Sequence, residues 1–365
     1  PPSTTSPHVT TTPPPSTTPA TAPAPPPADP AQIAHLTEIL DSHHSAGEFV
    51  GARIAVLDGD GSIAEATAGT TTVDPASPPV DLDIAWNVGS LTKTFVAVVV
   101  LQLAEEGRID LDADISGYMP DLPGADRITP RELLQHTSGF AEYINDPAVV
   151  ADQQRTWTPD ELIAVAVAAG NVSEPGGAHH YSNTNYIILG EIIRAVTGHS
   201  WADEIQTRIV EPLGLTNTHP LTTDRPVGYQ LIDGAFVDES DSQDPSIGGA
   251  AGALESTDHD LLLFAKALAD GTLLSARSMS AMLDFIPGDD YSQFGIRHGY
   301  GLGIEQYAND TLTVIGHMGT GNAQSAFVGF DAQHGTAVVV MTNTAVAGPQ
   351  AIMAFEALTA VEQAR

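Results

Sequence analysis

The strand signals of this chain gather at its two ends, and the long stretch between them has the pattern of helices. Near the start, segments 51–57 and 62–70 flank Asp58-Gly59-Asp60-Gly61, and Asp-Gly steps supply the positive φ angles of tight hairpin turns. Strand-like segments return later at 300–307, 311–315, 323–330 and 336–342. Strands from both ends can complete one antiparallel sheet if the middle of the chain is an insertion. We therefore predict an α+β fold, in which helices flank this sheet and a mainly helical subdomain is inserted into it.

Helical patterns account for most of the remaining chain. They are predicted at 29–46, 94–107, 130–136, 159–169, 184–197, 200–209, 257–269, 275–285 and 348–363. We expect one domain over residues 31–365, with a sheet subdomain at about 31–90 and 290–365 and a helical subdomain at about 91–289. Residues 1–30 are almost entirely Pro, Thr, Ser and Ala, so a disordered spacer is predicted there, serving either as a tether or as a plain terminus.

Composition removes several classes of function. The 365 residues include 46 acidic and 13 basic side chains, and the net charge of −33 repels nucleic acids and anionic membrane surfaces. The chain has no cysteine, which excludes disulfides, thiolate catalysis and cysteine-ligated metals. No apolar run is long enough for a membrane-spanning helix. We expect a secreted or cell-surface-tethered domain; no signal peptide or lipid anchor is visible in the sequence, but one could have been removed.

One of the two lysines in the chain follows a serine at a helical spacing, in Ser90-Leu91-Thr92-Lys93. Side chains one helical turn apart share a face, so Lys93 can take the Ser90 hydroxyl proton if burial lowers the pKa of its amine. The apolar run 94–107 predicts a buried helix with Ser90 at its N-terminus, where free backbone N–H groups favour negative charge. Ser90 is therefore a candidate nucleophile. Alternatively, Ser90 is only an N-cap and Lys93 is a solvated first-turn side chain.

A second candidate segment is Tyr181-Ser182-Asn183, just before the predicted helix 184–197. A phenol beside a cationic lysine can have its pKa depressed and can carry protons, and an Asn amide can bond both the lysine and a substrate carbonyl. Alternatively, this segment is a capping turn flanked by a packing tyrosine.

The third segment is Gly316-His317-Met318-Gly319-Thr320-Gly321, which we place between two predicted strands. Glycines such as Gly319 let a substrate backbone approach, and the N–H groups of Thr320 and Ser90 can together form an oxyanion hole. Alternatively, this segment is a plain glycine-rich hairpin turn.

The three motifs occur in the order, and near the spacing, found in the penicillin-recognising serine hydrolases. From about residue 31 to its end, the chain most resembles the branch that contains class C β-lactamases and secreted actinobacterial D-alanyl-D-alanine carboxypeptidases. The resemblance implies that Ser90 is the acylated nucleophile, Lys93 its proton acceptor and Tyr181 the proton donor to the leaving group. It also implies that Asn183 positions the substrate amide and that His317 stands where other branches have Lys. A small peptide, ester, amide or β-lactam substrate is implied, with cell-wall peptide among the candidates, and no metal or organic cofactor.

Two residues depart from the carboxypeptidase pattern and bear on the substrate. Met318 replaces a Thr whose hydroxyl helps to hold a terminal carboxylate, and Glu305 stands where the pattern has an Arg for the same carboxylate. An anion beside a substrate carboxylate replaces attraction by repulsion. The resemblance favours a D-alanyl-D-alanine carboxypeptidase, whereas these two residues favour an esterase or D-amino-acid amidase. A penicillin-binding sensor without turnover is a further interpretation.

No metal site is predicted from the sequence. The thirteen histidines include the pairs His43-His44 and His179-His180, but none has the acidic spacing of a zinc motif. The acidic run 238–244 is interpreted as a solvated loop.

Overall fold

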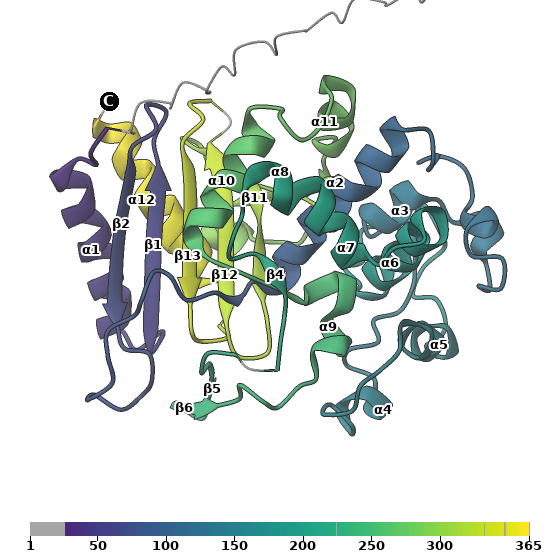
Figure 1. The fold of residues 1–365 in the computed structure, drawn as a ribbon, viewed down its shortest axis with the longest axis horizontal. Helices are drawn as coiled ribbons and strands as arrows, with labels where there is room; N and C mark the ends of the chain where they lie inside the picture. The colour runs from purple at the N-terminus through teal and green to yellow at the C-terminus, as the bar shows by residue number, and fades with distance from the viewer. Residues whose placement is uncertain (1–25, 224, 332, 347, 365) are drawn as a thin grey trace, which may run out of the picture.

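The computed structural model describes residues 26–364 except 224, 332 and 347, so the predicted spacer lies almost wholly outside the described residues. Its centre is an eight-stranded antiparallel sheet in the order β2-β1-β13-β12-β11-β10-β9-β8 (Figure 1). β1 (Gly51–Leu57) pairs with β13 (Ala337–Thr342), with Ala52 opposite Thr342 and Leu57 opposite Ala337. The predicted α+β fold, with one sheet built from both ends of the chain, is confirmed.

The other strands of the sheet follow the hydrophobic pattern of the sequence. Every residue of β1 is buried, whereas the edge strand β2 alternates between buried and half-buried residues. The bounds of the remaining strands are β2 (Ile63–Gly69), β8 (Ile286–Pro287), β9 (Arg297–Tyr300), β10 (Glu305–Ala308), β11 (Thr313–Thr320) and β12 (Ser325–Asp331).

Helices cover both faces of the sheet, and the sheet separates two hydrophobic cores (Figure 1). α1 (Pro30–Ser45) and α12 (Pro349–Ala364) pack on one face, and α10 (Asp258–Ala269) packs on the other. Successive side chains of β13 point to opposite faces of the sheet and so enter different cores. Val338 and Val340 belong to the core under α1 and α12, whereas Val339 and Met341 belong to the larger core.

The larger core continues into a helical region around α2 (Thr92–Glu105). Most of α2 is buried, which explains why its sequence is apolar on all sides. The other helices of this part of the chain are α3 (Pro130–Leu134), α4 (Pro147–Val150), α5 (Pro159–Ala169), α6 (Thr184–Thr197), α7 (Trp201–Ile205), α8 (Glu211–Leu213), α9 (Pro245–Gly252) and α11 (Ala276–Met282). The predicted helix at 200–209 is instead α7 followed by a π-helical turn at Gln206–Val210.

Two predicted strand boundaries are wrong in ways that affect the site. The strand expected at 300–307 is broken, because Tyr300 ends β9 and Glu305 begins β10. Leu302 and Ile304 in the intervening turn are buried, so the apolar alternation continues through a reversal of direction. The strand expected at 311–315 continues to Thr320, so the third motif is part of β11 rather than a hairpin turn.

Short β elements also interrupt the region expected to be mainly helical. β3 (Trp86–Asn87) and β4 (His219–Pro220) flank β7 (Leu254–Ser256) in a small sheet, and β5 (Tyr229–Ile232) pairs with β6 (Ala235–Asp238) in a hairpin. An Asp-Gly step, Asp233-Gly234, forms the turn of this hairpin, so the same local signal used for the first hairpin was present here.

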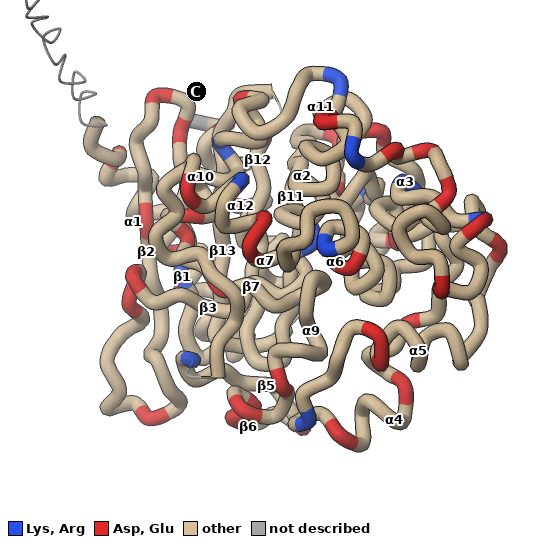
Figure 2. The backbone as a smooth tube through the Cα atoms, turned by 45° about the vertical axis from the view of Figure 1, so that its right-hand side comes forward, with Lys and Arg blue, Asp and Glu red and all other residues tan. Residues whose placement is uncertain are grey.

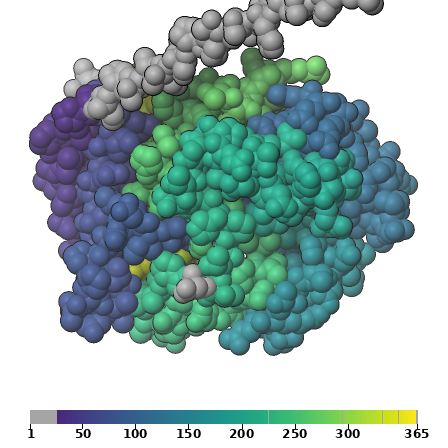
Figure 3. Space-filling model, viewed as in Figure 1, coloured from purple at the N-terminus to yellow at the C-terminus, as the bar shows by residue number. Residues whose placement is uncertain are grey.

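The surface reflects the acidic composition. Asp and Glu positions recur along the whole backbone, with far fewer Lys and Arg (Figure 2). The C-terminal strands are almost entirely hidden behind earlier segments on the face shown in Figure 3, as expected for the centre of a covered sheet. Within the described part of the chain, no helix has the length and apolar character needed to cross a membrane.

Candidate active site

Ser90 lies in a short 3₁₀ turn, η1 (Gly89–Leu91), which leads directly into α2. Asn87 holds this turn in place. Its Oδ1 accepts the Gly89 N–H at 3.1 Å, and its Nδ2 donates to the carbonyl oxygens of Gly252 and Leu254, each at 3.1 Å. The Ser90 side chain is half-buried at the N-terminal end of a buried helix.

β11 approaches this turn so closely that two positions require glycine. A Cβ atom on Gly319 would overlap the Val88 carbonyl oxygen. A Cβ atom on Gly89, where φ is 51°, would lie 2.5 Å from the Thr320 carbonyl carbon. The two glycines thus allow the backbone of Thr320 to lie beside the Ser90 turn, as a shared oxyanion site requires.

Lys93 is completely buried and touches three oxygen atoms. Its Nζ lies 2.9 Å from Ser90 Oγ, 2.7 Å from Asn183 Oδ1 and 2.7 Å from the Ala251 carbonyl oxygen. Burial lowers the pKa of Lys93 to about 7, against the opposing effects of Glu142 and, more weakly, Glu305. The alternative of a solvated first-turn lysine is therefore wrong.

These three partners determine where the lone pair of a neutral Lys93 points. The Asn183 amide oxygen and the Ala251 carbonyl oxygen only accept hydrogen bonds, so each takes one N–H of the amine. The third direction, which holds the lone pair, faces the Ser90 hydroxyl. With a pKa of about 7, much of the amine is neutral at neutral pH. The arrangement suits direct transfer of the Ser90 proton to Lys93.

Glu142 is a residue of this site that the sequence did not reveal. Its Oε2 accepts hydrogen bonds from the Asn183 backbone N–H at 2.6 Å and from Asn183 Nδ2 at 3.0 Å. These bonds turn the oxygen of the Asn183 amide toward Lys93. The charge of Glu142 also raises the pKa of Lys93. Glu142 lies 41 positions from Asn183 and belongs to no recognisable motif, so only the fold brings the two together.

Tyr181 lies next to both Ser90 and Lys93. The Lys93 Nζ is 4.9 Å from the centroid of its ring, and its hydroxyl interacts with the Ser90 hydroxyl. The expectation that the lysine depresses the pKa of this phenol is wrong. Burial raises the pKa of Tyr181 well above its usual value, and the bond to Ser90 offsets this only in part. Tyr181 is therefore protonated at neutral pH, and Lys93 is the available base.

A chain of buried hydrogen bonds connects the second motif to the third. The Ser182 backbone N–H donates to His136 Nδ1 at 3.1 Å, so the proton of a neutral His136 is on Nε2 and points to the Tyr300 hydroxyl at 3.2 Å. Tyr300 then donates to His317 Nε2 at 3.0 Å, and His317 Nδ1–H donates to the Met318 carbonyl. Burial lowers the pKa values of His136 and His317, so both rings are neutral. His317 thus supports β11 from behind and does not line the cavity.

Glu305 also lies away from the cavity, and its expected contact with substrate is corrected here. It is 6% exposed, its Oε2 accepts the Met318 N–H at 3.0 Å and the Tyr307 hydroxyl, and its Oε1 is 3.5 Å from His298 Nε2. Burial favours the neutral carboxyl, but His317, His298 and Tyr307 hold the pKa of Glu305 at about 2. The Glu305 carboxylate therefore accepts a hydrogen bond from a backbone N–H of β11 that lies just beyond the last residue pair between β11 and β10.

The Met318 side chain is likewise directed away from Ser90. It packs against the core under α1 and α12, because successive residues of a strand point to opposite faces. Its expected contact with substrate through the side chain is corrected in the same way.

A cavity of about 290 Å³ opens at Ser90. Ser90, Asn183 and Thr320 form its reactive end. Its other walls include Tyr143, Arg225, Gln230, Asp244 and Asn322. The structure therefore brings together Ser90, Lys93, Tyr181, Asn183 and the backbone of Gly319–Thr320, and leaves Glu305 and the Met318 side chain outside.

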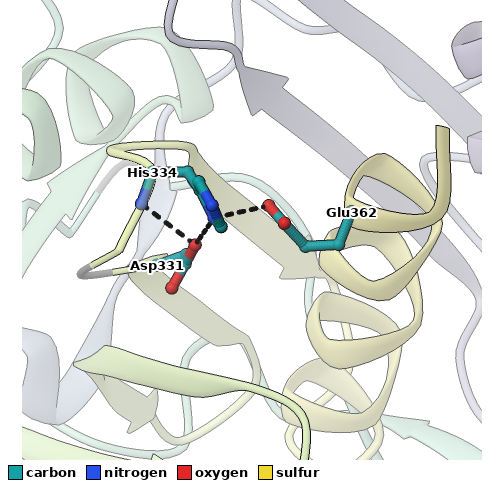
Figure 4. A group of neighbouring side chains, drawn as sticks. All are labelled: Asp331, His334 and Glu362. Carbon is teal, nitrogen blue, oxygen red and sulfur yellow. Dashed lines mark hydrogen bonds and ion pairs between the residues drawn. The ribbon is translucent and has the colours of Figure 1, made fainter. Parts of the chain in front are cut away.

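One group among the described residues has ligand atoms close enough to share a metal ion, and it is far from Ser90. His334 Nδ1 lies 2.7 Å from Asp331 Oδ2 and 3.0 Å from Glu362 Oε1 (Figure 4). Asp331 is at the opposite end of β12 from the Ser90 cavity. The imidazole contacts both carboxylates directly, so the group ties the β12–β13 turn to α12 and gives the site at Ser90 no metal.

Comparison with known proteins identifies relatives over most of this chain. A family model named β-lactamase matches residues 33–362. The putative penicillin-binding protein PbpX of Bacillus subtilis is 31% identical over 249 residues, which are 63% of this chain and 61% of that protein. Penicillin-binding protein 4 of Amycolatopsis lactamdurans is 27% identical over 343 residues, 87% of each chain. The chain thus spans about three fifths of the first relative and most of the second.

A solved structure gives a match over the whole fold. The D-amino acid amidase of Ochrobactrum anthropi SV3, solved with L-phenylalanine amide, superposes with a TM-score of 0.83 at 27% identity. The superposition covers 92% of this chain and 99% of the amidase.

Proposed function

This chain belongs to the β-lactamase family of serine hydrolases, and from that premise we propose that it cleaves small amides and esters through an acyl-enzyme on Ser90. The observation that carries the proposal is the environment of Lys93. Its buried Nζ has a pKa of about 7 and directs its lone pair at the Ser90 hydroxyl. A lysine with only a structural role, or one in solvent, would require neither a lowered pKa nor a lone pair directed at the Ser90 hydroxyl.

In the proposed reaction, neutral Lys93 takes the hydroxyl proton as Ser90 Oγ attacks the substrate carbonyl carbon. The N–H groups of Ser90 and Thr320 stabilise the oxyanion, and Asn183 holds the substrate amide. Tyr181 donates its phenolic proton to the leaving amine or alcohol and recovers a proton from Lys93, so that the C–N or C–O bond breaks with no charge left behind. Water then attacks the acyl-enzyme, with Lys93 again as proton acceptor, and releases the acid.

We propose an amide or ester of a D-amino acid as substrate, rather than a peptide that ends in a free carboxylate. The leaving group lies toward Tyr181, and the ionised groups behind that region include the anion Glu305. His136 and His317, which lie between, are neutral and supply no positive charge for a carboxylate. The D-amino acid amidase that shares this fold at 27% identity supports the same substrate class.

A D-alanyl-D-alanine carboxypeptidase is the second candidate, because the curated relatives are named as penicillin-binding proteins. That activity needs a cation for the terminal carboxylate, and the basic side chain next to Tyr181, Lys93, is already bonded to Ser90, Asn183 and the Ala251 carbonyl. In this case a β-lactam would acylate Ser90, and a lasting adduct without turnover would indicate a sensor.

A substrate panel tests the proposal. We expect kcat/KM for D-phenylalanine amide and for a short-chain p-nitrophenyl ester to be at least about tenfold above that for a D-Ala-D-Ala peptide. Ser90→Ala should lower kcat/KM for the amide and for the ester by about three orders of magnitude or more. Ser280→Ala, which changes an exposed serine on α11, is the matched control. Hydrolysis that survives Ser90→Ala contradicts the mechanism, and faster turnover of the peptide favours the carboxypeptidase.

We further propose that the protein acts outside the cytoplasm, with residues 1–30 as the tether. The Pro- and Thr-rich composition of this segment, which suits an extended spacer, supports this location. Fractionation of cells that express the natural gene would test it, and recovery of the protein with the cytoplasm would contradict it.

A further inference from the structure

The basic side chains of this acidic protein are almost all neutralised by partners. The following have a carboxylate oxygen within 4 Å: Arg53, Arg108, Arg127, Arg131, Arg155, Arg194, Arg208, Lys266 and Arg297. Within the described parts of the chain, the basic residues without such a partner are Lys93, Arg225 and Arg277. Lys93 is the proposed base and Arg277 is exposed on α11. Arg225 is the one that requires an explanation.

Arg225 is half-buried in the wall of the same cavity that Ser90 opens into. Its guanidinium makes a single hydrogen bond to the described residues, from Nη2 to the Gln243 carbonyl oxygen at 2.8 Å. Its Nε is buried without a hydrogen-bond partner. A guanidinium has five N–H donors in a planar fork that matches a carboxylate, so most of its binding capacity is unused.

Asp244 lines the same cavity but does not neutralise Arg225 through a direct contact. Its carboxylate accepts hydrogen bonds from the Ser246 N–H at 2.9 Å and from the Thr156 hydroxyl at 3.1 Å. Arg225 is among the causes that lower the pKa of Asp244, but no Asp244 oxygen lies within ion-pair distance of the guanidinium. Asp244 is thus occupied by α9 and its neighbours. The charge of Arg225 also acts on the Glu255 carboxylate. Within the described residues, however, neither carboxylate forms an ion pair with the guanidinium, so its fork remains available.

The position of Arg225 also indicates which half of a substrate it would meet. Tyr181, the proposed donor to the leaving group, stacks with His136 and Tyr300, and none of these three residues lines the cavity. The proposed role of Tyr181 as proton donor places the leaving group next to its phenol. The cavity runs from Ser90 and Thr320 to Gln230 and Asn322, so the acyl half is the part of the substrate expected there.

We propose that Arg225 anchors a carboxylate carried by the acyl half of the substrate, so that the preferred substrates are amides or esters of acid-bearing acyl groups. The inference rests on the proposed function and names the substrate class of that same site. A carboxylate would pair with the fork of Arg225 while the scissile carbonyl reaches Ser90. A protein of net charge −33 repels anions at long range, so an unpaired arginine inside its cavity is a local exception that favours one kind of ligand.

Two matched substrates test this inference: N-succinyl-D-phenylalanine p-nitroanilide and its succinamide counterpart, which differ only in a terminal carboxylate or carboxamide. For the natural protein, we expect kcat/KM for the succinyl substrate to exceed that for the succinamide by about tenfold, the effect of one charge-assisted hydrogen bond. In Arg225→Gln this ratio should fall to about one through a higher KM for the succinyl substrate. Arg277→Gln, which removes the same charge from an exposed site, should keep the natural ratio. An unchanged ratio in Arg225→Gln overturns the inference.

A binding measurement keeps this test separate from the test of the reaction. Calorimetry on Ser90→Ala, with N-succinyl-D-phenylalanine amide and its succinamide counterpart as probes, needs no turnover. We expect tighter binding of the succinyl probe by about tenfold, and loss of that preference when Arg225→Gln is added. Equal binding of both probes overturns the Arg225 inference even if hydrolysis occurs. Preferential binding without any hydrolysis supports it while contradicting the proposed function.

Discussion

Glu142→Gln should shift the working pH of the enzyme downward, because it removes the anion that most strongly raises the pKa of Lys93. Gln keeps one oxygen that can accept the two Asn183 hydrogen bonds, and it loses only the oxygen that accepts the Ile144 N–H. The neutral amine is the reactive form, and kcat/KM therefore rises as the pH increases through the pKa of Lys93. A lower pKa moves that rise to lower pH.

The size of the shift follows from the path between the two charges. Lys93 Nζ and Glu142 Oε2 are joined through one amide by hydrogen bonds of 2.7 and 3.0 Å. The charges are therefore about 7 Å apart, and at an effective dielectric of about 20 they interact by about 2 kcal/mol, or about 1.5 pKa units. The acid limb of the kcat/KM profile should move from a pKa of about 7 to about 5.5.

The assay measures kcat/KM for the p-nitrophenyl ester between about pH 4.5 and 9. This range covers the acid limb of the natural protein and the shifted limb expected for Glu142→Gln. Glu38→Gln on α1 removes an equally charged side chain from an exposed position on the other face of the sheet and should leave the limb in place. An acid limb that stays near 7 in Glu142→Gln, or moves upward, refutes Lys93 as the base that this limb reports.

Two further changes test the packing around β11. Gly319→Ala should destabilise the protein by about 1–3 kcal/mol in urea unfolding and reduce kcat, because its methyl group would push β11 away from Val88 and the Ser90 turn; unaltered stability and rate would contradict the close approach. Glu305→Arg should destabilise the protein by about 3–5 kcal/mol, because it buries an unpaired cation next to His298 and His317. A stable Glu305→Arg protein with improved turnover of a D-Ala-D-Ala peptide would instead place this residue at the substrate.

The sequence predicted local elements well where their ends carry clear chemical signals. The predicted helix 159–169 matches α5, which begins with Thr158 as its N-cap and a capping box to Glu161. The predicted helix 184–197 matches α6, which ends at Gly198 in the left-handed conformation. Pairing of the first and last strands could also be anticipated, because distant strands with alternating or continuous apolar patterns need a common sheet.

The direction and surroundings of single side chains could not be read from spacing. Glu305 is near the third motif in the fold, but sequence position does not tell that its carboxylate binds the Met318 N–H within the sheet. The raised pKa of Tyr181 depends on burial by several distant segments, which outweighs the nearby lysine. Glu142 and Arg225 belong to no motif, and their roles depend on contacts that only the folded chain creates.

The pairing of β1 with β13 has a consequence for the order in which this enzyme becomes functional. During synthesis, the ribosome delivers the Ser90 turn early, but β11 and the last strand of the sheet leave it only near the end of the chain. A nascent or prematurely ended polypeptide therefore holds Ser90 without the strand that brings Thr320 beside it. Hydrolytic capacity is expected only once β11, β12 and β13 have joined the sheet, so polypeptides that stop before these strands would be inert.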